Sequence, residues 1–168
     1  MTSPPTNQTP PRFCDSGEGR NDKIHTVTTP ISNSPAFIWP VRVYWEDTDA
    51  GGIVFYANYL KFFERARTEW LRSLGIEQSR LKDELHGMFV VAETNVRYIA
   101  PSRLDDELMV TARLESAGRA SLTIHQQAFL KSEQSLMLCE GSIRIGWVDA
   151  STLQPKRIPA TILERLNT

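Results

Sequence analysis

The sequence predicts one α+β domain, in which an antiparallel sheet of about five strands surrounds a single long helix. Two observations support this class. Apolar residues recur at spacings of three and four over residues 58–74, and at every second position in four later segments. The first period is that of a helix with one buried face, and the second is that of half-buried antiparallel strands. Because the apolar face of the helix must be covered, we expect the helix to lie on one face of the sheet.

The first elements are a strand and the long helix. Residues Phe37–Trp45 are expected to form the strand, and Pro40 places its start at a sheet edge, since proline cannot donate to the ladder. The helix is expected over Asn58–Leu74, with Gly75 as its C-cap. A short polar helix follows over Glu77–Leu85. The apolar stripe of the long helix, which we expect in the core, comprises Tyr59, Phe62, Phe63, Ala66, Trp70 and Leu74.

Four strands with a period of two complete the domain. The first alternates at Val90, Ala92, Thr94, Val96 and Tyr98, the second at Leu108, Val110, Ala112 and Leu114, and the third at Leu122, Ile124, Ala128 and Leu130. The fourth ends in Ile143, Ile145 and Trp147. Turns at Gly118-Arg119 and Glu133-Gln134 are expected to join the last three strands as hairpins. A sheet of this kind around one helix keeps open edges, so we expect the chain to associate through an edge.

The composition argues against several classes of protein. The chain has 168 residues, with 19 Lys and Arg against 20 Asp and Glu, whereas nucleic-acid binders carry a clustered basic excess. No uncharged apolar run approaches the roughly 18 residues that span a bilayer. The first residues lack the basic and apolar regions of a secretory signal, and the two cysteines, Cys14 and Cys139, make no disulfide framework. We therefore expect a cytoplasmic protein that binds no nucleic acid and does not span a membrane.

An N-terminal extension precedes the domain. Residues 1–36 hold six of the ten prolines and few apolar residues, and their charges cancel. Such a segment buries too little apolar surface to offset its ordering entropy, so we expect it to be disordered. It has no charge block or repeat that would mark a recruitment tail, and we expect a dispensable extension. The remaining residues, 37–168, form the predicted domain.

The loop between the first strand and the long helix has the most unusual composition. Three carboxylates, Glu46, Asp47 and Asp49, are followed by Gly51 and Gly52 and then by an apolar run into the helix. The glycines let a ligand approach the backbone, and the helix start offers free N–H groups and a positive dipole end. A carboxylate beside a helix N-terminus supplies two parts of acyl-transfer chemistry, a nucleophile or base and an oxyanion site. On spacing alone, such a loop is more often an acidic turn with a glycine hinge than a catalytic site.

Motifs of other enzyme classes are absent from the sequence. It contains no G-x-S-x-G elbow, no P-loop and no G-x-G-x-x-G motif. His25, His86 and His125 have no metal-ligand spacing, so we expect neither a metal nor a bound cofactor. Cys139 lies in an apolar strand and is expected to be a packed thiol rather than a nucleophile.

Three segments resemble a known enzyme family. Asp47–Tyr59, with the sequence DTDAGGIVFYANY, is similar to the signature loop of the 4-hydroxybenzoyl-CoA thioesterase class of hotdog-fold enzymes. Glu64–Leu71 and Ala100–Asp106 resemble the acyl-CoA thioesterases associated with the Tol-Pal system, often called YbgC-type. The resemblance covers residues 41–159, essentially the whole predicted domain. It implies a hotdog fold, a homodimer or homotetramer, hydrolysis of acyl-CoA or acyl-carrier-protein thioesters, and association with cell-envelope or lipid-synthesis proteins.

The resemblance also assigns roles to individual residues. It places the catalytic carboxylate on Asp49 and the oxyanion donor on the backbone N–H of Tyr56. Many YbgC-type members carry His at the position of Tyr56, whereas the tyrosine resembles the hydroxybenzoyl-CoA enzymes. The candidate substrate-binding residues are Gly51, Gly52, Asn58 and Glu64. Judged by residue type alone, Asn58 is expected to orient the helix start, and Glu64 is expected to be a solvated or paired charge. Asp47 is expected to accept hydrogen bonds from loop N–H groups.

Two alternatives to a thioesterase stay open at this point. A hydratase or dehydratase on the same fold would need a His paired with a carboxylate, and neither His86 nor His125 has such a motif around it. A non-catalytic acyl-binding or Tol-Pal envelope-complex protein would have no need of Asp49 in a glycine loop. The acyl chain length, and the choice between nucleophile and general base for Asp49, do not follow from the sequence.

Overall fold

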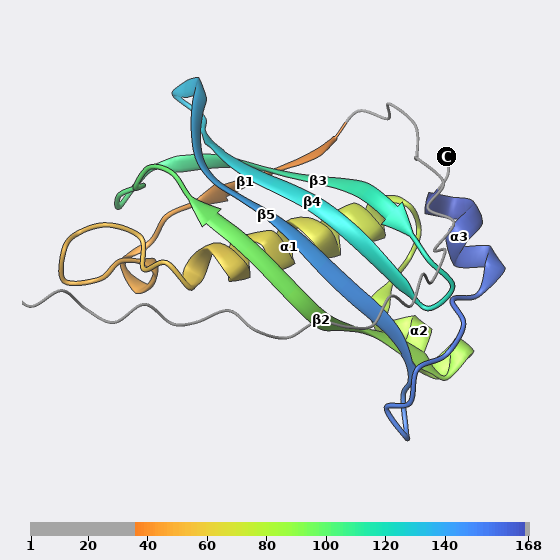
Figure 1. Cartoon of the computed structure of the whole chain (residues 1–168). Helices are drawn as coiled ribbons and strands as arrows, with labels where there is room; N and C mark the ends of the chain where they lie inside the picture. The colour runs from red at the N-terminus through yellow and green to blue at the C-terminus, as the bar shows by residue number, and fades with distance from the viewer. Residues whose placement is uncertain (1–35, 167–168) are drawn as a thin grey trace, which may run out of the picture.

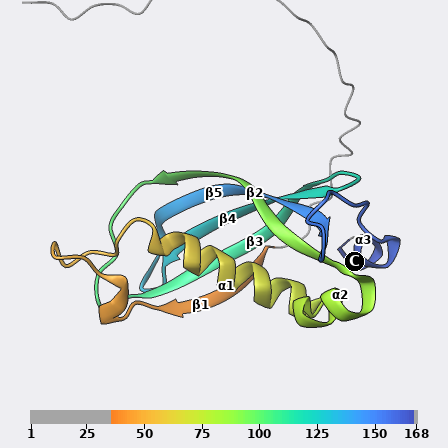
Figure 2. The same ribbon diagram turned by 90° about the horizontal axis from the view of Figure 1, so that it is seen from below.

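The computed structural model describes residues 36–166 and confirms the predicted α+β class. Figures 1 and 2 show an antiparallel sheet that curves around one long helix, with its five strands in the order β1-β3-β4-β5-β2. The strands are β1 (Phe37–Arg42), β2 (Gly87–Tyr98), β3 (Glu107–Ala117), β4 (Ser121–Leu130) and β5 (Glu133–Asp149). The helices are η1 (Trp45–Asp47), α1 (Asn58–Ser73), α2 (Gln78–Leu85) and α3 (Ala160–Leu166). Apart from Ala36, the predicted N-terminal extension, residues 1–36, lies outside the described residues, as do residues 167 and 168.

The core lies between α1 and the sheet. The predicted apolar stripe of α1 is confirmed, since Phe62, Phe63 and Ala66 are fully buried and only Leu74, after the last turn, is half-buried. The predicted alternation in β3 and β4 is also confirmed. The buried residues are Leu108, Val110, Ala112 and Leu114 in β3, and Leu122, Ile124 and Ala128 in β4. The apolar face of a helix, with its spacing of three and four residues, thus packs on strand faces whose apolar residues alternate.

The ends of the helices follow local sequence signals. Gly75 has a φ of +73°, in the left-handed region that favours glycine, and its N–H donates to the carbonyl of Arg72 at 2.9 Å. The predicted polar helix is confirmed as α2, with Glu77 as its N-cap residue. The sequence pattern does not predict α3, because seven residues with two buried positions, Ile162 and Leu166, are too short to display a period.

β1 is an edge strand, as Pro40 predicts, but it is shorter than expected. It ends at Arg42 and not at Trp45. Oδ2 of Asp47 accepts the N–H of Tyr44 at 2.9 Å, and the chain turns into η1 with Trp45 exposed. A side-chain acceptor three residues ahead therefore overrides the strand propensity of two aromatic residues.

The hairpin between β4 and β5 turns two residues earlier than predicted. Lys131 and Ser132 form the turn, and Glu133 already belongs to β5. Lys131 donates its backbone N–H to the carbonyl of Glu107 and its Nζ to the carboxylate of the same residue, both at 2.8 Å. A contact with β3, which the local sequence does not reveal, accompanies the shift. The turn at Gly118-Arg119 lies where it is predicted.

β2 departs from simple alternation because it contains a β-bulge. Val91 and Glu93 pair with consecutive residues of β5, so Ala92 is an extra residue in the ladder. Val91 and Thr94 therefore lie opposite two buried isoleucines of β5, on the side that faces α1. The prediction that Val90 shares a face with Thr94 is wrong, because one inserted residue exchanges the two faces of a strand.

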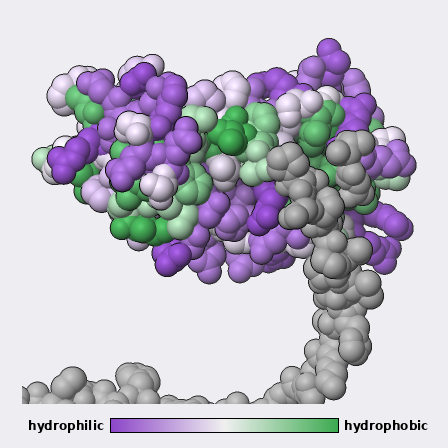
Figure 3. All heavy atoms as spheres, turned by 90° about the horizontal axis from the view of Figure 1, so that it is seen from above, coloured by the Kyte–Doolittle hydropathy of each residue, from purple (hydrophilic) through white to green (hydrophobic). Residues whose placement is uncertain are grey.

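The surface is mainly hydrophilic where Figure 3 shows it. On this face of the molecule, hydrophobic side chains form separate patches between hydrophilic ones. Scattered apolar residues are usual on protein surfaces, and only a contiguous group of them needs an explanation. Within residues 36–166, no helix has the length and apolar character needed to cross a membrane.

A close contact at the start of β2 provides a test of the packing. A Cβ on Gly87 would lie 2.3 Å from Cζ2 of Trp147, whose indole is buried in the core. We expect Gly87→Ala to lower the free energy of unfolding by about 1–3 kcal/mol, because the indole cannot move without disturbing its neighbours. Gly146→Ala is the control, since its Cβ would meet nothing closer than 3.9 Å. Denaturant unfolding measures both variants, and equal stabilities would contradict the expected clash.

Candidate active site

Asp47 ties together the two ends of the loop that precedes α1. Its side chain is only 1% exposed, and its carboxylate accepts the N–H of Tyr44. Its carbonyl oxygen accepts two further hydrogen bonds at 2.9 Å, one from the Phe55 N–H and one from Nδ2 of Asn58. The expected role of Asp47, bonding loop N–H groups, is therefore confirmed.

Residues 48–54 form a small hairpin that projects beyond the start of α1 (Figure 1). Its two legs pair between Thr48 and Val54, and Ile53 also forms a bridge to the segment before β3. Gly52 has a φ of +72°, a conformation that side chains rarely adopt. The tight turn at this position therefore requires glycine.

The carboxylate of Asp49 is exposed at the base of this hairpin. Its Oδ1 accepts the N–H of Gly51 at 2.8 Å, and the N–H of Asp49 donates to the carbonyl of Ile53 at 2.9 Å. A Cβ on Gly51 would lie 3.0 Å from Oδ1, so glycine keeps this approach open. Within residues 36–166, Oδ2 has no hydrogen-bond partner. One carboxylate oxygen is thus held in place while the other is free to react.

Tyr56 lies in the turn that leads into α1. No acceptor within residues 36–166 bonds its N–H, whereas the N–H groups of Phe55 and Asn58 are occupied. A free N–H at a helix start lies at the positive end of the helix dipole. Asn58 is buried, and its amide joins the helix start to Asp47. The contacts of Asn58 therefore fit its expected role in orienting the start of α1.

An apolar groove of about 240 Å³ begins beside Tyr56. The ring of Tyr98 lies 6.0 Å from that of Tyr56 and 5.9 Å from that of Tyr59, between centroids. The hydroxyl of Tyr59 shares a hydrogen bond of 2.8 Å with Ser102, and burial raises the pKa of the phenol. Tyr59 therefore stays neutral and forms a fixed wall. Such a groove suits the apolar part of a ligand.

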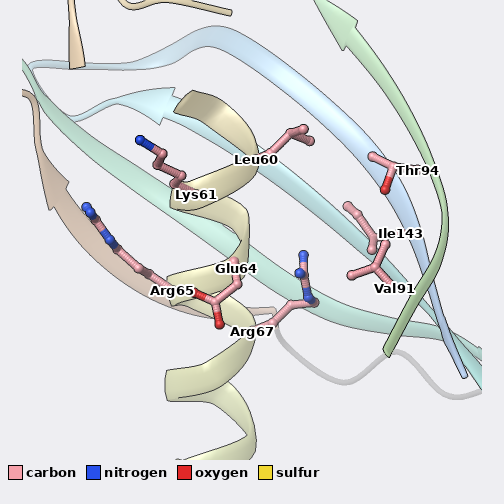
Figure 4. Close-up of a pocket in the computed structure, with 8 residues that line it drawn as sticks. All are labelled: Leu60, Lys61, Glu64, Arg65, Arg67, Val91, Thr94 and Ile143. Carbon is pink, nitrogen blue, oxygen red and sulfur yellow. The ribbon is translucent and has the colours of Figure 1, made fainter. Parts of the chain in front are cut away.

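A larger cavity of about 470 Å³ lies between α1 and β2 (Figure 4). Its lining comprises Leu60, Lys61, Glu64, Arg65, Arg67, Val91, Thr94 and Ile143. Glu64, a candidate substrate-binding residue, therefore borders a cavity, and its Oε1 accepts the hydroxyl of Thr68 at 2.7 Å. The other three candidates, Gly51, Gly52 and Asn58, border neither this cavity nor the apolar groove.

Arg67 and Gln126 are buried polar residues, and neither is among the functional residues expected from the sequence. Nη1 of Arg67 donates to Oε1 of Gln126 at 2.7 Å. Burial lowers the pKa of the Arg67 guanidinium, although arginine keeps its charge at physiological pH. The sequence does contain a signal for this pair, because Gln126 occupies a core-facing position of β4 between Ile124 and Ala128. A polar residue at such a position needs a buried partner.

Cys139 is a packed thiol, as expected. Its side chain is fully buried, and burial, aided by the charge of Glu140, raises the pKa of the thiol to about 12. The reactive thiolate is therefore scarce at neutral pH. Among the described residues, no group of three His, Cys, Asp or Glu is placed to hold a metal ion.

The loop and the helix start together fit attack on a carbonyl carbon. Asp49 offers a carboxylate with one free oxygen, and Tyr56 offers a free N–H for the charge that develops on the carbonyl oxygen. The apolar groove beside them offers binding surface for the rest of an acyl compound. These parts are the ones that acyl transfer requires.

Known proteins resemble the chain over most of its length. The model of the thioesterase-like superfamily matches residues 43–166. The acyl-CoA thioester hydrolase YbgC of Escherichia coli O6:H1 is 40% identical over 131 residues, which are 78% of this chain and 96% of that protein. The acyl-CoA thioesterase YbgC of Haemophilus influenzae is 40% identical over 126 residues, which are 75% of this chain and 90% of that protein.

Solved structures share the fold. A probable thioesterase from Bartonella henselae is 28% identical, with a TM-score of 0.69 over 74% of this chain and 100% of that chain. A 1,4-dihydroxy-2-naphthoyl-CoA thioesterase from Synechocystis has a TM-score of 0.72 over 79% of this chain and 96% of that chain. At 16% identity, the second likeness shows the fold alone. The predicted hotdog fold is confirmed.

The bond between Asn58 and the Asp47 carbonyl joins the loop to the helix start, and its loss should affect both. We expect Asn58→Ala to lower the free energy of unfolding by about 1–3 kcal/mol, because it removes a buried hydrogen bond. Amide hydrogen exchange in residues 48–54 should also become faster. Thr48→Ala is the control, since it removes only a more exposed bond to the carbonyl of Trp45. Unchanged exchange in the hairpin of Asn58→Ala would contradict the anchoring role.

Proposed function

This chain belongs to the thioesterase-like superfamily, and we propose that it hydrolyses the thioester bond of acyl-CoA or of an acyl group on carrier protein. The observation that carries the proposal is the presence, in one loop, of the free Oδ2 of Asp49 and the free N–H of Tyr56. The two YbgC relatives, each 40% identical, have names that state hydrolysis of acyl-CoA thioesters. CoA enters as part of the substrate.

In the proposed reaction the thioester carbonyl lies against the start of α1. The N–H of Tyr56 donates to the carbonyl oxygen and stabilises the negative charge that develops there. The carboxylate of Asp49 either attacks the carbonyl carbon or takes a proton from the water that attacks it. By either route the C–S bond breaks, the departing thiolate is protonated, and water supplies the hydroxyl of the acid. The hydrogen bond from Gly51 keeps the carboxylate oriented.

The alternatives have less support from the geometry. A hydratase or dehydratase would need a histidine beside the catalytic carboxylate. His86 ends α2, and His125 lies opposite Arg113 in the middle of the sheet, so neither belongs to the loop that contains Asp49. A purely acyl-binding protein would need the groove but not the free carboxylate.

Two finer properties belong to the proposal. One is a cytoplasmic location, and the other is association with the Tol-Pal system of the cell envelope or with proteins of lipid synthesis. The location rests on the composition of the chain, and the association rests on the resemblance of residues 41–159 to YbgC-type enzymes. Co-purification of the tagged full chain from its own cells, with identification of the captured proteins, tests the association.

A homodimer formed through the edge of β2 is also part of the proposal, with a homotetramer as a pair of such dimers. β2 is one of the two edge strands, so one side of its ladder has no partner strand within residues 36–166. Six exposed apolar side chains of the loop, α1 and the β2 region form what we call the apolar strip: Phe55, Tyr56, Leu60, Val91, Tyr98 and Ile99. A second copy placed along β2 would cover both features.

Replacement of Asp49 tests the catalytic assignment. We expect Asp49→Asn to lower kcat by about 10²–10⁴-fold, because an amide neither attacks the carbonyl nor accepts a proton. Thermal stability and binding of an acyl-CoA thioether should persist, since the amide oxygen can still accept the N–H of Gly51. Glu46→Gln, which removes a neighbouring exposed carboxylate, should keep the wild-type rate. Thiol release from an acyl-CoA series measures both variants, and full turnover by Asp49→Asn would refute the assignment.

A charge in the apolar strip tests the proposed dimer. Val91 is 56% exposed in the single chain, and Val91→Asp should shift the assembly toward monomer, because the interface would bury an unpaired carboxylate. Leu153→Asp is the matched control, since Leu153 is 59% exposed but lies in the turn after β5. Sedimentation velocity over a range of concentrations measures both variants. A monomeric wild type, or equal dissociation of the two variants, would rule out this interface.

A further inference from the structure

Arg67 has a buried charge with no salt-bridge partner among residues 36–166. Its side chain is 8% exposed and projects from α1. Nη1 donates to Oε1 of Gln126 at 2.7 Å, which is the one acceptor that the described residues offer to the guanidinium. Because Gln126 is neutral, this hydrogen bond does not neutralise the charge, and the nearby Glu64 offsets the effect of burial only in part. A buried charge without a partner is unfavourable, so an anion bound at this position would stabilise it.

Gln126 holds the guanidinium in one orientation. Nε2 of Gln126 donates to the carbonyl oxygens of Phe63 and Thr111, at 2.9 and 3.3 Å. Since both amide hydrogens are used in this way, Oε1 must accept from Arg67. The guanidinium is therefore held through Nη1, while its Nε and Nη2 have no acceptor within residues 36–166.

The free nitrogens of Arg67 reach the cavity between α1 and β2. Among the described residues, the one fully buried side-chain N or O atom without a hydrogen bond is Nε1 of Trp147, so Nε and Nη2 of Arg67 are not sealed in protein. Figure 4 shows the guanidinium extending from α1 into the space in front of Val91, Thr94 and Ile143. A ligand in this cavity can therefore contact them.

The other charges around the cavity leave it positive. Glu64 lies one turn before Arg67, and its charge acts against the lowering of the Arg67 pKa by burial. Its Oε1 accepts the hydroxyl of Thr68, however, and no ion pair joins it to Arg67 in the described part of the chain. Lys61 and Arg65 leave α1 on the other side of the helix and add positive charge to the lining (Figure 4). Three cations against one carboxylate favour an anionic ligand group.

The cavity lies along α1 and begins at Leu60, four residues after Tyr56. Arg67 comes nine residues after Asn58, which corresponds to about 13 Å along a helix axis. Leu60, Val91 and Ile143 provide apolar wall along this distance. An acyl chain with its thioester at Tyr56 would therefore pass apolar side chains first and meet the guanidinium at its far end.

We propose that Arg67 binds a carboxylate at the far end of the acyl chain, so that the preferred substrates are thioesters of dicarboxylic acids. The proposal rests on the proposed function, because it requires the thioester to lie at the start of α1. A carboxylate supplies the missing negative charge and accepts two parallel hydrogen bonds from the forked donors Nε and Nη2. A neutral alkyl end would leave the guanidinium buried and unpaired.

Pairs of substrates with equal chain length test the proposal on the wild-type full chain. Butyryl-, hexanoyl-, octanoyl- and decanoyl-CoA are each compared, by thiol release, with the CoA thioester of the dicarboxylic acid of the same length. For the best pair, we expect kcat/KM to be about tenfold to a hundredfold higher for the dicarboxylic member. Equal values or a neutral preference in every pair would overturn the proposal and leave the hydrolase function intact. No turnover of either set would overturn the proposed function, and this proposal with it.

Variants assign the preference to the guanidinium. Arg67→Met removes the charge but keeps a long side chain, and we expect it to lose the preference for the dicarboxylic member of each pair. Arg67→Lys keeps the charge without the forked donors and should give an intermediate preference. Arg72→Met is the matched control on the same helix, because Arg72 is exposed and paired with Glu69, and it should keep the full preference.

The remaining outcomes also decide the question. If Arg67→Met keeps the wild-type preference, the guanidinium does not bind the carboxylate and the proposal fails. If the oligomer dissociates in this variant while the preference is unchanged, the guanidinium belongs to a subunit contact, which also overturns the proposal. If the variant does not fold, the wild-type comparison of paired substrates still supports or overturns the proposal.

Discussion

The buried Asp47 is the constraint on which the geometry of the site depends. Its carboxylate turns the chain after β1, and its carbonyl oxygen binds both the chain leaving the hairpin and the side chain at the helix start. Asp49 lies two residues after it, and Tyr56 directly follows Phe55, which is one of its partners. One residue without exposed reactive atoms therefore sets the relative positions of the carboxylate and the N–H that the reaction needs. Within one acidic cluster, Asp47 therefore positions the loop and Asp49 supplies the reactive carboxylate.

The second constraint is that one helix cannot fill the concave side of a five-stranded sheet. α1 lies closest to β3 and β1 in the sheet, while the gap toward β2 keeps two cavities and several exposed apolar side chains. The bulge at Ala92 turns Val91 toward this gap, so local irregularity in the strand shapes its wall. The proposed binding of an acyl chain and the proposed contact with a second copy both use this incompletely covered face between α1 and β2.

Prediction from sequence succeeds where the physical cause is local. The stripe from Tyr59 to Trp70 predicts α1, Gly75 predicts its end, and alternation predicts the buried faces of β3 and β4, because each depends on period or backbone conformation over a few residues. It fails where a distant contact decides. The early turn at Lys131 accompanies its bonds to Glu107, and an inserted residue in β2 leaves no signature in composition. The placement of Glu64 beside a cavity also needed the position of β2.

The sequence by itself determined the fold class, the order of the five strands with α1 and α2, and the loop in which Asp49 and Tyr56 occur. These follow from short-range patterns and from a motif in contiguous residues. Only the tertiary structure decided which polar groups are satisfied and which are free. The side-chain NH2 of Gln126 donates to the carbonyl groups of Phe63 and Thr111, which directs its Oε1 toward Arg67. Arg67 and Gln126 are 59 residues apart in the sequence. Burial and hydrogen bonding depend on what the folded chain places around a group, and no local pattern encodes that.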